Sequence, residues 1–481
     1  MSVQLAIIVA YFILTVVLGV YASSKAKNSA AFHGYALGVG AIVYTSAGEW
    51  LGGTATTGVS EYGFVYGLSG AWFTIANGIG VMVLALCFAG LYRSLNTITV
   101  PGIIEKFLGS AARSVSSILL TIVMLVVGIS QMIAAGKLGQ SLLGFDFNVT
   151  VVVFAVIFIV YTLAGGMPAV ASTNKMHLLT MYGGVFLALA FAGTKVGGWS
   201  SLTAGIAAVE AAEGGGGYFN MFSIGMPRVS SWILASILGV CTAQAGIQPV
   251  LAAKDIPTAK KACIITAFVT APFGLLTALL GMIAKVMSHR QMLLDVNGIN
   301  VIDGKLALPT LMMNLPPIVG GIVLASILAA ILSTVSPIIL AAGTMVTKDL
   351  YQRVFKPGAS DAEVMRMSRV TTALSGVICC FAAIALVDAT KVLDIVYSAY
   401  SLRGALFVVL LLGIYWKKAS GKGACWGMIL TVVCSVSWAV VKITTGHYPI
   451  SDAITETYVA IFVALFGTIA CSILWPNKSA E

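Results

Sequence analysis

The stretch VYTSAGEWLGGTATTGVSEYG, residues 43–63, is apolar overall but carries features that a regular membrane helix rarely has. Three glycines, Gly48, Gly52 and Gly53, lie near its middle, beside the ionisable Glu49. Lipid cannot hydrogen-bond to exposed backbone groups, so irregular backbone at bilayer depth must line a cavity or be buried in protein. Glycines also allow membrane helices to pack closely, but Glu49 is costly unless it faces a polar interior. We therefore predict a discontinuous helix at a functional site.

The composition of the whole chain places this stretch in a membrane protein. Of 481 residues, 59% are hydrophobic and only 9% are charged, and the mean hydropathy is +1.00. Soluble globular proteins carry about 25% charged residues, so a soluble enzyme, a secreted disulfide scaffold and a disordered regulator are excluded. The excess of Lys and Arg over Asp and Glu, 27 against 17, is typical of cytoplasmic loops in a membrane protein. We expect no nucleic-acid partner.

Cysteines and histidines form no recognisable chemical site. The eight cysteines lie mostly in apolar runs and form no CxxC pair, and the four histidines show no metal-ligand spacing. No acid/base constellation lies on the predicted helices. We therefore expect neither an enzyme nor an organic cofactor.

Apolar runs near the ~20 residues that a spanning helix needs recur along the chain. We place about thirteen of them, at roughly 4–22, 38–61, 66–92, 114–140, 148–166, 167–194, 227–252, 262–286, 317–343, 369–388, 392–416, 423–442 and 454–475. The chain is predicted to be an all-α, multi-pass integral protein of the plasma (inner) membrane, with 1–481 as a single transmembrane domain. Most Lys and Arg outside the spans, including Lys25, Lys27 and Lys478, fall on one side when the N-terminus is outside, which predicts a cytoplasmic C-terminus.

The seventh apolar run offers a weaker counterpart of the first stretch. It reads GVCTAQAGIQPVLAAKD, residues 239–255. Gln244 and Gln248 share a helix face at i and i+4, and Pro249 removes a backbone donor directly after them. A matched pair of interrupted helices in two halves of a transporter indicates a binding site at the bilayer midplane.

The ninth run, residues 320–354, places oxygen atoms on one helix stripe. Ala330, Ser333 and Thr334 lie at i, i+3 and i+4, so two hydroxyls and one carbonyl direction converge. Neutral oxygens of this kind could hold a monovalent cation without burying a carboxylate. Serine and threonine in such helices also commonly bond back to their own backbone, and spacing alone leaves both interpretations open.

Five stretches together resemble the sodium:solute symporter family. They read, in order, GEWLGGTATTGVSEYGFVYGL (48–68), TVPGIIEKFLG (99–109), GGMPAVASTNKMH (165–177), QAGIQPVLAAKD (244–255) and LAAILSTVSPIILAAGTMVTKDLYQ (328–352), of which the last is the most specific. The resemblance implies an inverted-repeat fold of the leucine-transporter type, with two five-helix repeats. Here the repeats would span 38–194 and 227–416, with one extra helix at 4–22 and two more at 423–475.

The resemblance also implies a sodium site. The backbone carbonyls of Gly48, Leu51 and Ala330 and the hydroxyls of Ser333 and Thr334 would form it. Some members of the family hold a second sodium with an aspartate and further hydroxyls. In this chain Asn174 stands where that aspartate would be and Pro337 replaces one hydroxyl, although Ser336 is kept. We therefore expect one sodium ion.

Charged residues inside the spans bear on the solute. Arg403, unusual for the family at its position, would suit bidentate recognition of a carboxylate. It could instead pair internally with Glu49 or Asp394, or snorkel to an interface. Other residues that could line a solute site are Trp50, Trp72, Gln131, Gln244, Gln248, Tyr397 and Tyr400.

The combined expectation is a secondary active transporter. Inward sodium movement would drive uptake of a small polar or anionic organic solute by alternating access across the lipid bilayer. One alternative is proton coupling through Glu49 or Lys175, because a lysine pKa shifts readily, although Lys175 lies where a snorkelling side chain is ordinary. A passive channel or a transport-derived sensor is the second alternative. The oligomeric state is left open.

Overall fold

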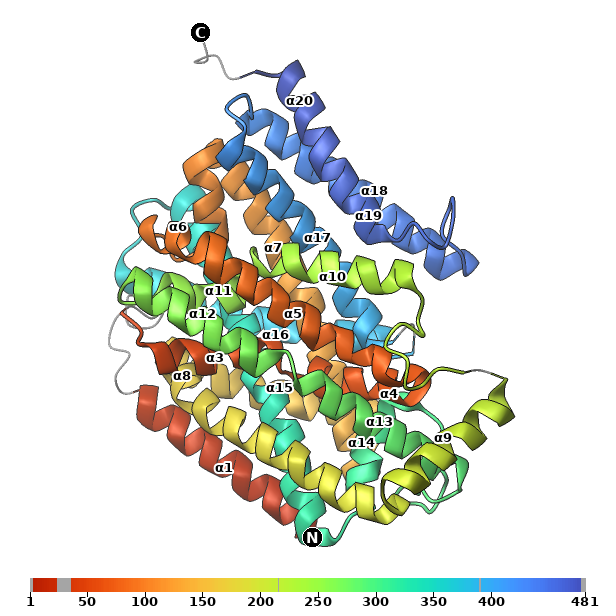
Figure 1. Cartoon of the computed structure of the whole chain (residues 1–481). Coiled ribbons are helices and arrows are strands. Elements are labelled where there is room, and N and C mark those ends of the chain that lie inside the picture. The colour runs from red at the N-terminus through yellow and green to blue at the C-terminus, as the bar shows by residue number, and fades with distance from the viewer. Residues whose placement is uncertain (1–2, 24–35, 215, 389–390, 477–481) are drawn as a thin grey trace.

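The molecule is a bundle of helices (Figure 1). The computed structural model describes residues 3–23, 36–214, 216–388 and 391–476, with backbone only for residues 20, 164–169 and 443. Lys25, Lys27 and Lys478, used above for orientation, lie outside the described residues. Within the described ranges, extended structure is limited to two isolated β-bridges, Leu37 with Ala253 and Leu294 with Asn300.

The first half of the chain forms a short N-terminal helix and a series of long or interrupted ones. In order these are α1 (Val3–Ser23), α3 (Val39–Trp50), the π-helix η1 (Thr54–Gly58), α4 (Val59–Tyr66), the 3-10 helix η2 (Gly67–Ala71), α5 (Trp72–Val83), the π-helix η3 (Leu84–Phe88), α6 (Ala89–Ser94), α7 (Val100–Leu143), α8 (Phe147–Val196) and α9 (Gly198–Glu213).

The second half repeats this alternation of broken and continuous helices. Its elements are α10 (Met226–Val240), α11 (Gln244–Leu251), α12 (Ile256–Thr270), α13 (Phe273–His289), α14 (Gly304–Met313), α15 (Pro317–Met345), the π-helix η4 (Val346–Phe355), α16 (Asp361–Leu386), α17 (Val392–Tyr415), α18 (Gly421–Thr445), α19 (Glu456–Phe462), the π-helix η5 (Val463–Gly467) and α20 (Thr468–Leu474).

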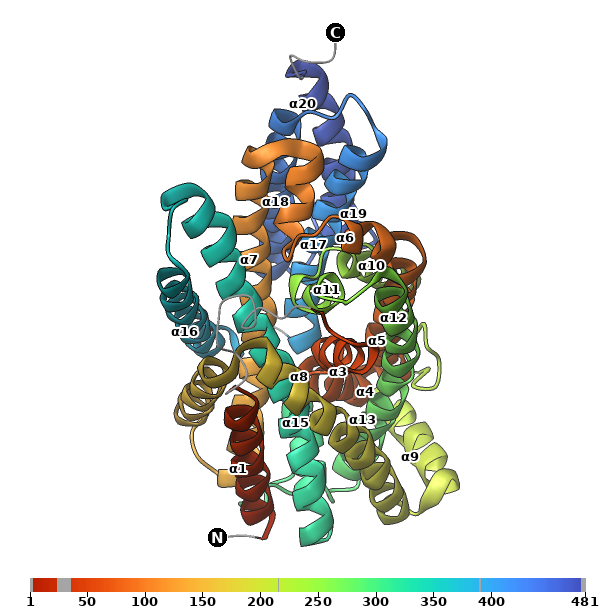
Figure 2. The ribbon, with the colours of Figure 1, turned by 90° about the vertical axis from the view of Figure 1, so that its left-hand side faces the viewer.

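Most of these helices can cross a membrane. In the described part of the chain, 10 helical segments are long and apolar enough to do so, and two shorter apolar helices, Val3–Gly19 and Phe147–Leu163, accompany them. The two spans expected at 148–166 and 167–194 form one helical element, α8. Its 50 residues exceed the ~20 that cross a bilayer, and its two halves run in different directions (Figure 2). The all-helical membrane architecture is therefore confirmed.

Helix α15 forms the core of the bundle. It packs against α1, α3, α7, α8 and α16, and nearly all of its side chains are buried, including Ser333, Thr334 and Ser336. Because a helix buried on all sides is apolar all round, the few polar groups on α15 must be satisfied by neighbouring helices or by a ligand. The C-terminal helices α18, α19 and α20 lie along one edge of the molecule, next to α17 (Figure 1).

Candidate sodium and solute sites

The predicted break in the second apolar run is confirmed. Helix α3 ends at Trp50, and Leu51 has non-helical angles of φ −104° and ψ 28°. The amide of Gly53 donates a hydrogen bond of 2.7 Å to Gln131 Oε1 on α7, and Gln131 Nε2 donates to Thr54 Oγ1 at 2.6 Å. The side chain of Gln131 thus satisfies the backbone that the break exposes, as an apolar surrounding requires.

The seventh run is also broken, but not where its proline suggested. Helix α10 ends at Val240 and α11 begins at Gln244, so the break precedes the glutamine pair, and Pro249 lies within α11. The Thr242 hydroxyl in this break donates to the carbonyl of Arg403 at 2.6 Å. Because proline has no N–H group, Pro249 leaves the carbonyl of Ala245, four residues earlier in α11, without its helical donor.

Oxygen atoms from α3 and α15 meet at the first break. The carbonyl of Gly48 accepts hydrogen bonds from Ser333 Oγ at 3.2 Å and from Thr334 Oγ1 at 2.5 Å. Ser333 Oγ also lies 2.8 Å from the carbonyl of Ala330. Leu51 is buried at the end of α3, without a hydrogen bond to α15 among the described residues. Four of the five predicted sodium ligands therefore lie together, and every oxygen in the group is neutral.

Glycine is required for this approach of α3 to α15. A Cβ atom on Gly48 would lie 2.6 Å from Asn174 Nδ2 and 3.2 Å from Ser333 Cβ, and a Cβ on Gly52 would collide with Thr334 Oγ1. The glycines of the stretch thus serve close packing as well as the break, so the two interpretations of the sequence are compatible.

Asn174 lies next to the oxygen atoms contributed by α3 and α15. Its Nδ2 donates to the carbonyl of Ser333 at 3.3 Å, and the buried Ser336 hydroxyl has no partner within the described residues. Lys175, the neighbour of Asn174, is exposed. In this geometry the neutral Asn174 amide presents its nitrogen, and not its oxygen, to the Ser333 carbonyl.

A second group of polar side chains lies in the interior, between α3, α5, α10 and α17. We call Glu49, Asn77, Ser236, Tyr397 and Arg403 the central polar cluster. All five are buried, and Arg403 is 0% exposed. Many polar atoms of this cluster have no hydrogen-bond partner within the described residues. They are Glu49 Oε2, both polar atoms of the Asn77 side chain, the hydroxyls of Ser236 and Tyr397, and all three guanidinium nitrogens of Arg403.

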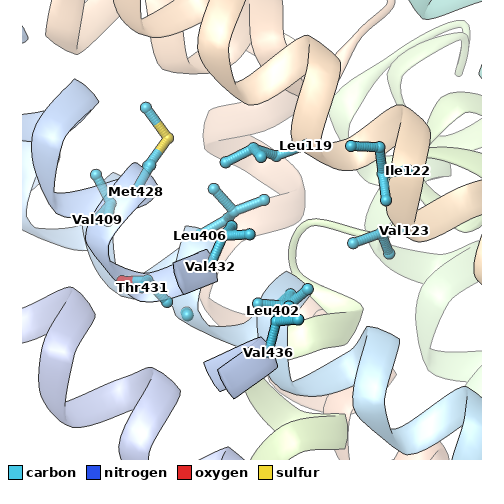
Figure 3. A pocket seen from close by; sticks show the side chains of 11 residues that line it. Leu119, Ile122, Val123, Leu402, Leu406, Val409, Met428, Thr431, Val432 and Val436 are labelled. Atoms are coloured by element: carbon cyan, nitrogen blue, oxygen red, sulfur yellow. The ribbon is translucent and has the colours of Figure 1, made fainter. Parts of the chain in front are cut away.

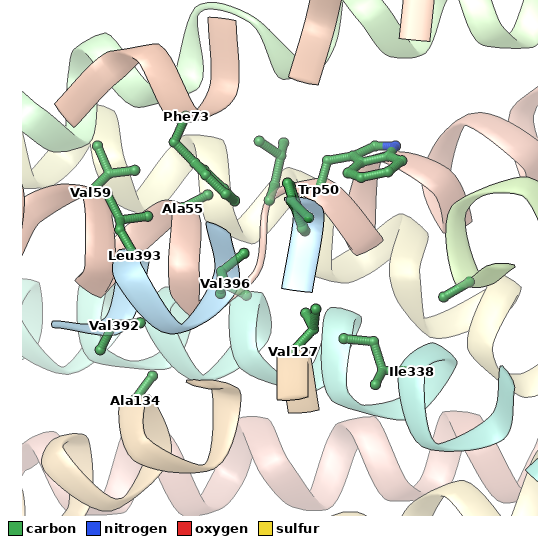
Figure 4. Packing of buried hydrophobic residues seen from close by; sticks show 14 of the residues in the cluster. Trp50, Ala55, Val59, Phe73, Val127, Ala134, Ile338, Val392, Leu393 and Val396 are labelled. Atoms are coloured by element: carbon green, nitrogen blue, oxygen red, sulfur yellow. The ribbon is translucent and has the colours of Figure 1, made fainter. Parts of the chain in front are cut away.

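Aromatic rings enclose this cluster. The Arg403 guanidinium lies 3.8 Å from the ring centroid of Tyr400 and 5.3 Å from that of Trp50, which is cation–π geometry. The ring of Tyr397 stacks on Trp232 at 4.3 Å, and Phe73 lies 5.9 Å from Tyr397. Figure 4 shows Trp50 and Phe73 in the packed interior with Val396 of α17. The rings exclude water and give the site an apolar wall.

The remaining predicted solute residues lie elsewhere. Trp72 Nε1 donates to the carbonyl of Met221 at 2.9 Å in a loop contact. Gln131 holds the α3 break. Gln244 accepts from the amide of Val100 at 2.7 Å, donates to the carbonyl of Ile98 at 3.0 Å and contacts Gln248, so the glutamine pair holds the start of α7.

Sequence reasoning missed Phe73, Asn77, Trp232 and Ser236. Asn77 had a usable signal, because it is a polar residue within the apolar run WFTIANGIGVMV and such residues face the bundle interior. Ser236 had none, since serine is common in membrane helices.

The cavity between α7, α17 and α18 is chemically different. It has a volume of about 70 Å³ and is lined by Leu119, Ile122, Val123, Leu402, Leu406 and other apolar residues, with Thr431 as its polar exception (Figure 3). It offers no charge and almost no hydrogen-bonding group, so it does not suit a polar solute.

Comparisons with known proteins identify the family of the chain. The sequence model of the Sodium:solute symporter family matches residues 34–431. The sodium/glucose cotransporter of Vibrio parahaemolyticus is 25% identical over 86% of this chain and 80% of its own length. The high-affinity proline transporter of Bacillus subtilis (strain 168) is 25% identical over 95% of this chain and 96% of its own.

Solved structures show the fold. A substrate-bound, outward-open Na+-coupled sialic acid symporter superposes with a TM-score of 0.79 at 18% identity, covering 100% of this chain and 99% of that one. The amino-acid-bound transporter MhsT, in complex with L-phenylalanine, superposes with a TM-score of 0.54 at 13% identity, covering 92% and 99%. The fold is therefore of the leucine-transporter type.

Proposed function

The chain belongs to the sodium:solute symporter family, so it is a sodium-coupled solute symporter and not an enzyme, and on that premise we propose where it binds its ion. Sodium is held by the carbonyls of Gly48, Leu51 and Ala330 and by the hydroxyls of Ser333 and Thr334. Support comes from the hydroxyls of Ser333 and Thr334 meeting the Gly48 carbonyl at 3.2 and 2.5 Å. Both hydroxyls belong to α15 and donate to the Gly48 carbonyl of α3, and they turn their lone pairs toward the ion when it binds.

One sodium ion is bound per transport cycle. Support comes from Asn174, which is neutral where an aspartate would be anionic and which turns its amide nitrogen toward the Ser333 carbonyl. A single charge moving inward gains about 2.3 kcal/mol per 100 mV of membrane potential, which is enough to drive accumulation of a solute.

The solute binds at the central polar cluster and at Trp50, beside the broken helices. Glu49 and Trp50 directly follow Gly48, so the residues that face the solute and the ion share one segment of α3. Sodium joining α3 to α15 orders the solute-binding face of α3, which couples the two binding events. Closing and opening of the helices around this cluster gives alternating access for a small polar or anionic solute.

The membrane arrangement has thirteen spans in a single domain, 1–481. The segment Thr54–Ser94 divides at Gly67, where φ is +68°, and α3, η1 and α4 then form one broken span. Repeats at 38–194 and 227–416 follow a first helix at 4–22 and precede two helices at 423–475. With the N-terminus outside and the C-terminus in the cytoplasm of a cell bounded by the plasma (inner) membrane, most Lys and Arg outside the spans are cytoplasmic.

The sodium site is tested by sodium-dependent thermal stability of the purified protein. A ligand that binds only the folded state at 100 times its Kd adds about 2.7 kcal/mol. We expect wild type to be stabilised by NaCl over choline chloride, and Ser333→Ala combined with Thr334→Ala to raise the half-saturating sodium concentration at least tenfold.

The matched control is Ser326→Ala. Ser326 lies on the same helix, is buried, and bonds only its own turn, to the Val323 carbonyl at 2.7 Å. It should leave the sodium response unchanged. An unaltered response in the double variant would refute the assignment.

A further inference from the structure

Two opposite charges face each other in the central polar cluster without forming an ion pair. Arg403 and Glu49 lie within electrostatic range of one another, yet no Lys or Arg nitrogen of the described residues approaches the Glu49 carboxylate within 4.0 Å. Both side chains are buried. A buried charge without a partner costs several kcal/mol, so each of these groups needs a counterpart.

The described residues supply no other acidic counterpart for Arg403. Asp394, on the same helix, accepts a hydrogen bond of 2.5 Å from the Tyr62 hydroxyl. The rings of Tyr400 and Trp50 lie beside the guanidinium, with centroids at 3.8 and 5.3 Å. A guanidinium has five donors in a planar fork. The Tyr400 hydroxyl interacts with one part of this fork, and no carboxylate of the described residues pairs with it. Most of its donors are therefore available for a carboxylate.

Building on the proposed function, we propose that the solute is a zwitterion, with its carboxylate on Arg403 and its ammonium group facing Glu49. A zwitterion brings one negative and one positive group, so it satisfies both buried charges at once. A simple carboxylate would leave Glu49 unpaired, and a neutral sugar would leave both charges unpaired. Bidentate binding of a carboxylate by arginine is short and strong.

The surrounding side chains fit the same ligand. Trp50, which follows Glu49 in α3, lies beside the Arg403 guanidinium with its ring centroid at 5.3 Å, so it adds an aromatic wall at the carboxylate end of the site. The unpartnered Asn77 amide and the hydroxyls of Ser236 and Tyr397 can take up the remaining polar atoms. The stacked rings of Trp232 and Tyr397 bound the site on one side and restrict it to a small solute.

The first test is a thermal-unfolding screen of the purified full chain in saturating sodium. The zwitterionic probes are the twenty α-amino acids, β-alanine, 4-aminobutyrate and glycine betaine. Their matched singly charged analogues are acetate, propionate and butyrate, and ethylamine and propylamine, with glucose as the neutral probe. We expect at least one zwitterion to stabilise the protein at a concentration at least tenfold lower than its matched carboxylate or amine.

The second test reverses the preference. Glu49→Gln removes the charge that faces the ammonium group. The affinity of this variant for the zwitterion should therefore fall at least tenfold, and its affinity for the matched carboxylate should rise. Arg403→Gln should lose affinity for both the zwitterion and the matched carboxylate. Lys175→Gln, an exposed change on α8, serves as the control and should behave as wild type.

The two proposals fail in different ways. Absence of stabilisation by sodium alone in wild type overturns the sodium site. The zwitterion proposal is overturned by any of three results obtained while sodium stabilises the protein normally. Either no zwitterion adds to the stabilisation, or a carboxylate or glucose stabilises equally well, or Glu49→Gln keeps the wild-type preference. The switch in preference with sodium stabilisation intact supports it.

Discussion

Two groups of charged side chains in this molecule differ in whether they are paired within the protein. At the start of α7, the α7–η4 network consists of Glu105, Arg113, Asp349 and Arg353. Arg113 donates to Asp349 Oδ1 from Nε at 2.9 Å and from Nη2 at 2.5 Å, and to Glu105 at 2.5 Å. Arg353 donates to the other oxygen of Glu105 at 2.8 Å. In the central polar cluster, by contrast, Glu49 and Arg403 have no ion-pair partner among the described residues.

The difference separates structural charge from functional charge. Asp349 is 0% exposed, and one of its oxygens also accepts from Thr99 Oγ1 at 3.0 Å, so it joins the start of α7 to η4. The charges of that network stabilise each other. The charges of the central polar cluster do not, and a membrane protein that keeps such charges keeps them for its ligand or its ion.

The largest effect is expected for Asp349→Ala. The change leaves the Arg113 guanidinium without its main partner in a half-buried position, and breaking a buried pair from one side costs about 3–5 kcal/mol. Urea or thermal unfolding of the purified variant measures the loss. A loss below about 1 kcal/mol would place this network with ordinary surface pairs.

An effect of opposite sign is expected for the double variant Glu49→Gln with Arg403→Met. Replacing buried charges by neutral groups of similar volume is neutral or stabilising by about 1–4 kcal/mol. Unfolding is measured without sodium and without solute, so that binding does not contribute. If the double variant is as destabilised as Asp349→Ala, the two charges stabilise the fold, and the contrast between the two groups is lost.

The smallest effect is expected for Arg353→Ala. The Arg353 side chain is 58% exposed, whereas that of its partner Glu105 is 17% exposed. Exposed pairs contribute about 0–1 kcal/mol and are screened by salt. Unfolding in low and high KCl should show a small loss that disappears at high salt. A large loss that persists in salt would extend the structural network to the surface.

Much of the candidate sodium site was predictable from local pattern. Helical spacing alone put Ala330, Ser333 and Thr334 on one stripe, and the glycines around Glu49 predicted the break in α3. Both features depend on residues that are neighbours in the chain. The Gly48 carbonyl, which lies opposite this stripe, was expected only from the family resemblance, because no spacing rule connects residue 48 to residue 333.

The residues predicted for the solute site only partly coincide with the cluster proposed here. Glu49, Trp50, Tyr397 and Arg403 lie in one region, but Trp72, Gln131, Gln244 and Gln248 do not. A glutamine beside a broken helix is equally suited to a ligand and to a freed backbone amide, and only the folded positions show that Gln131 bonds Gly53. Asn77 and Ser236 join the cluster from separate helices, and no local pattern connects them.

The sequence by itself determined that the chain is a membrane protein with interrupted helices, because hydropathy and backbone chemistry act over a few turns of one helix. Only the tertiary structure decided which polar groups are satisfied within the protein and which are left for a ligand. The physical reason is that a hydrogen bond or an ion pair needs contact within about 3–4 Å. For Gln131 and Gly53, for Arg113 and Asp349, and for the unpaired Glu49 and Arg403, folding alone sets that distance.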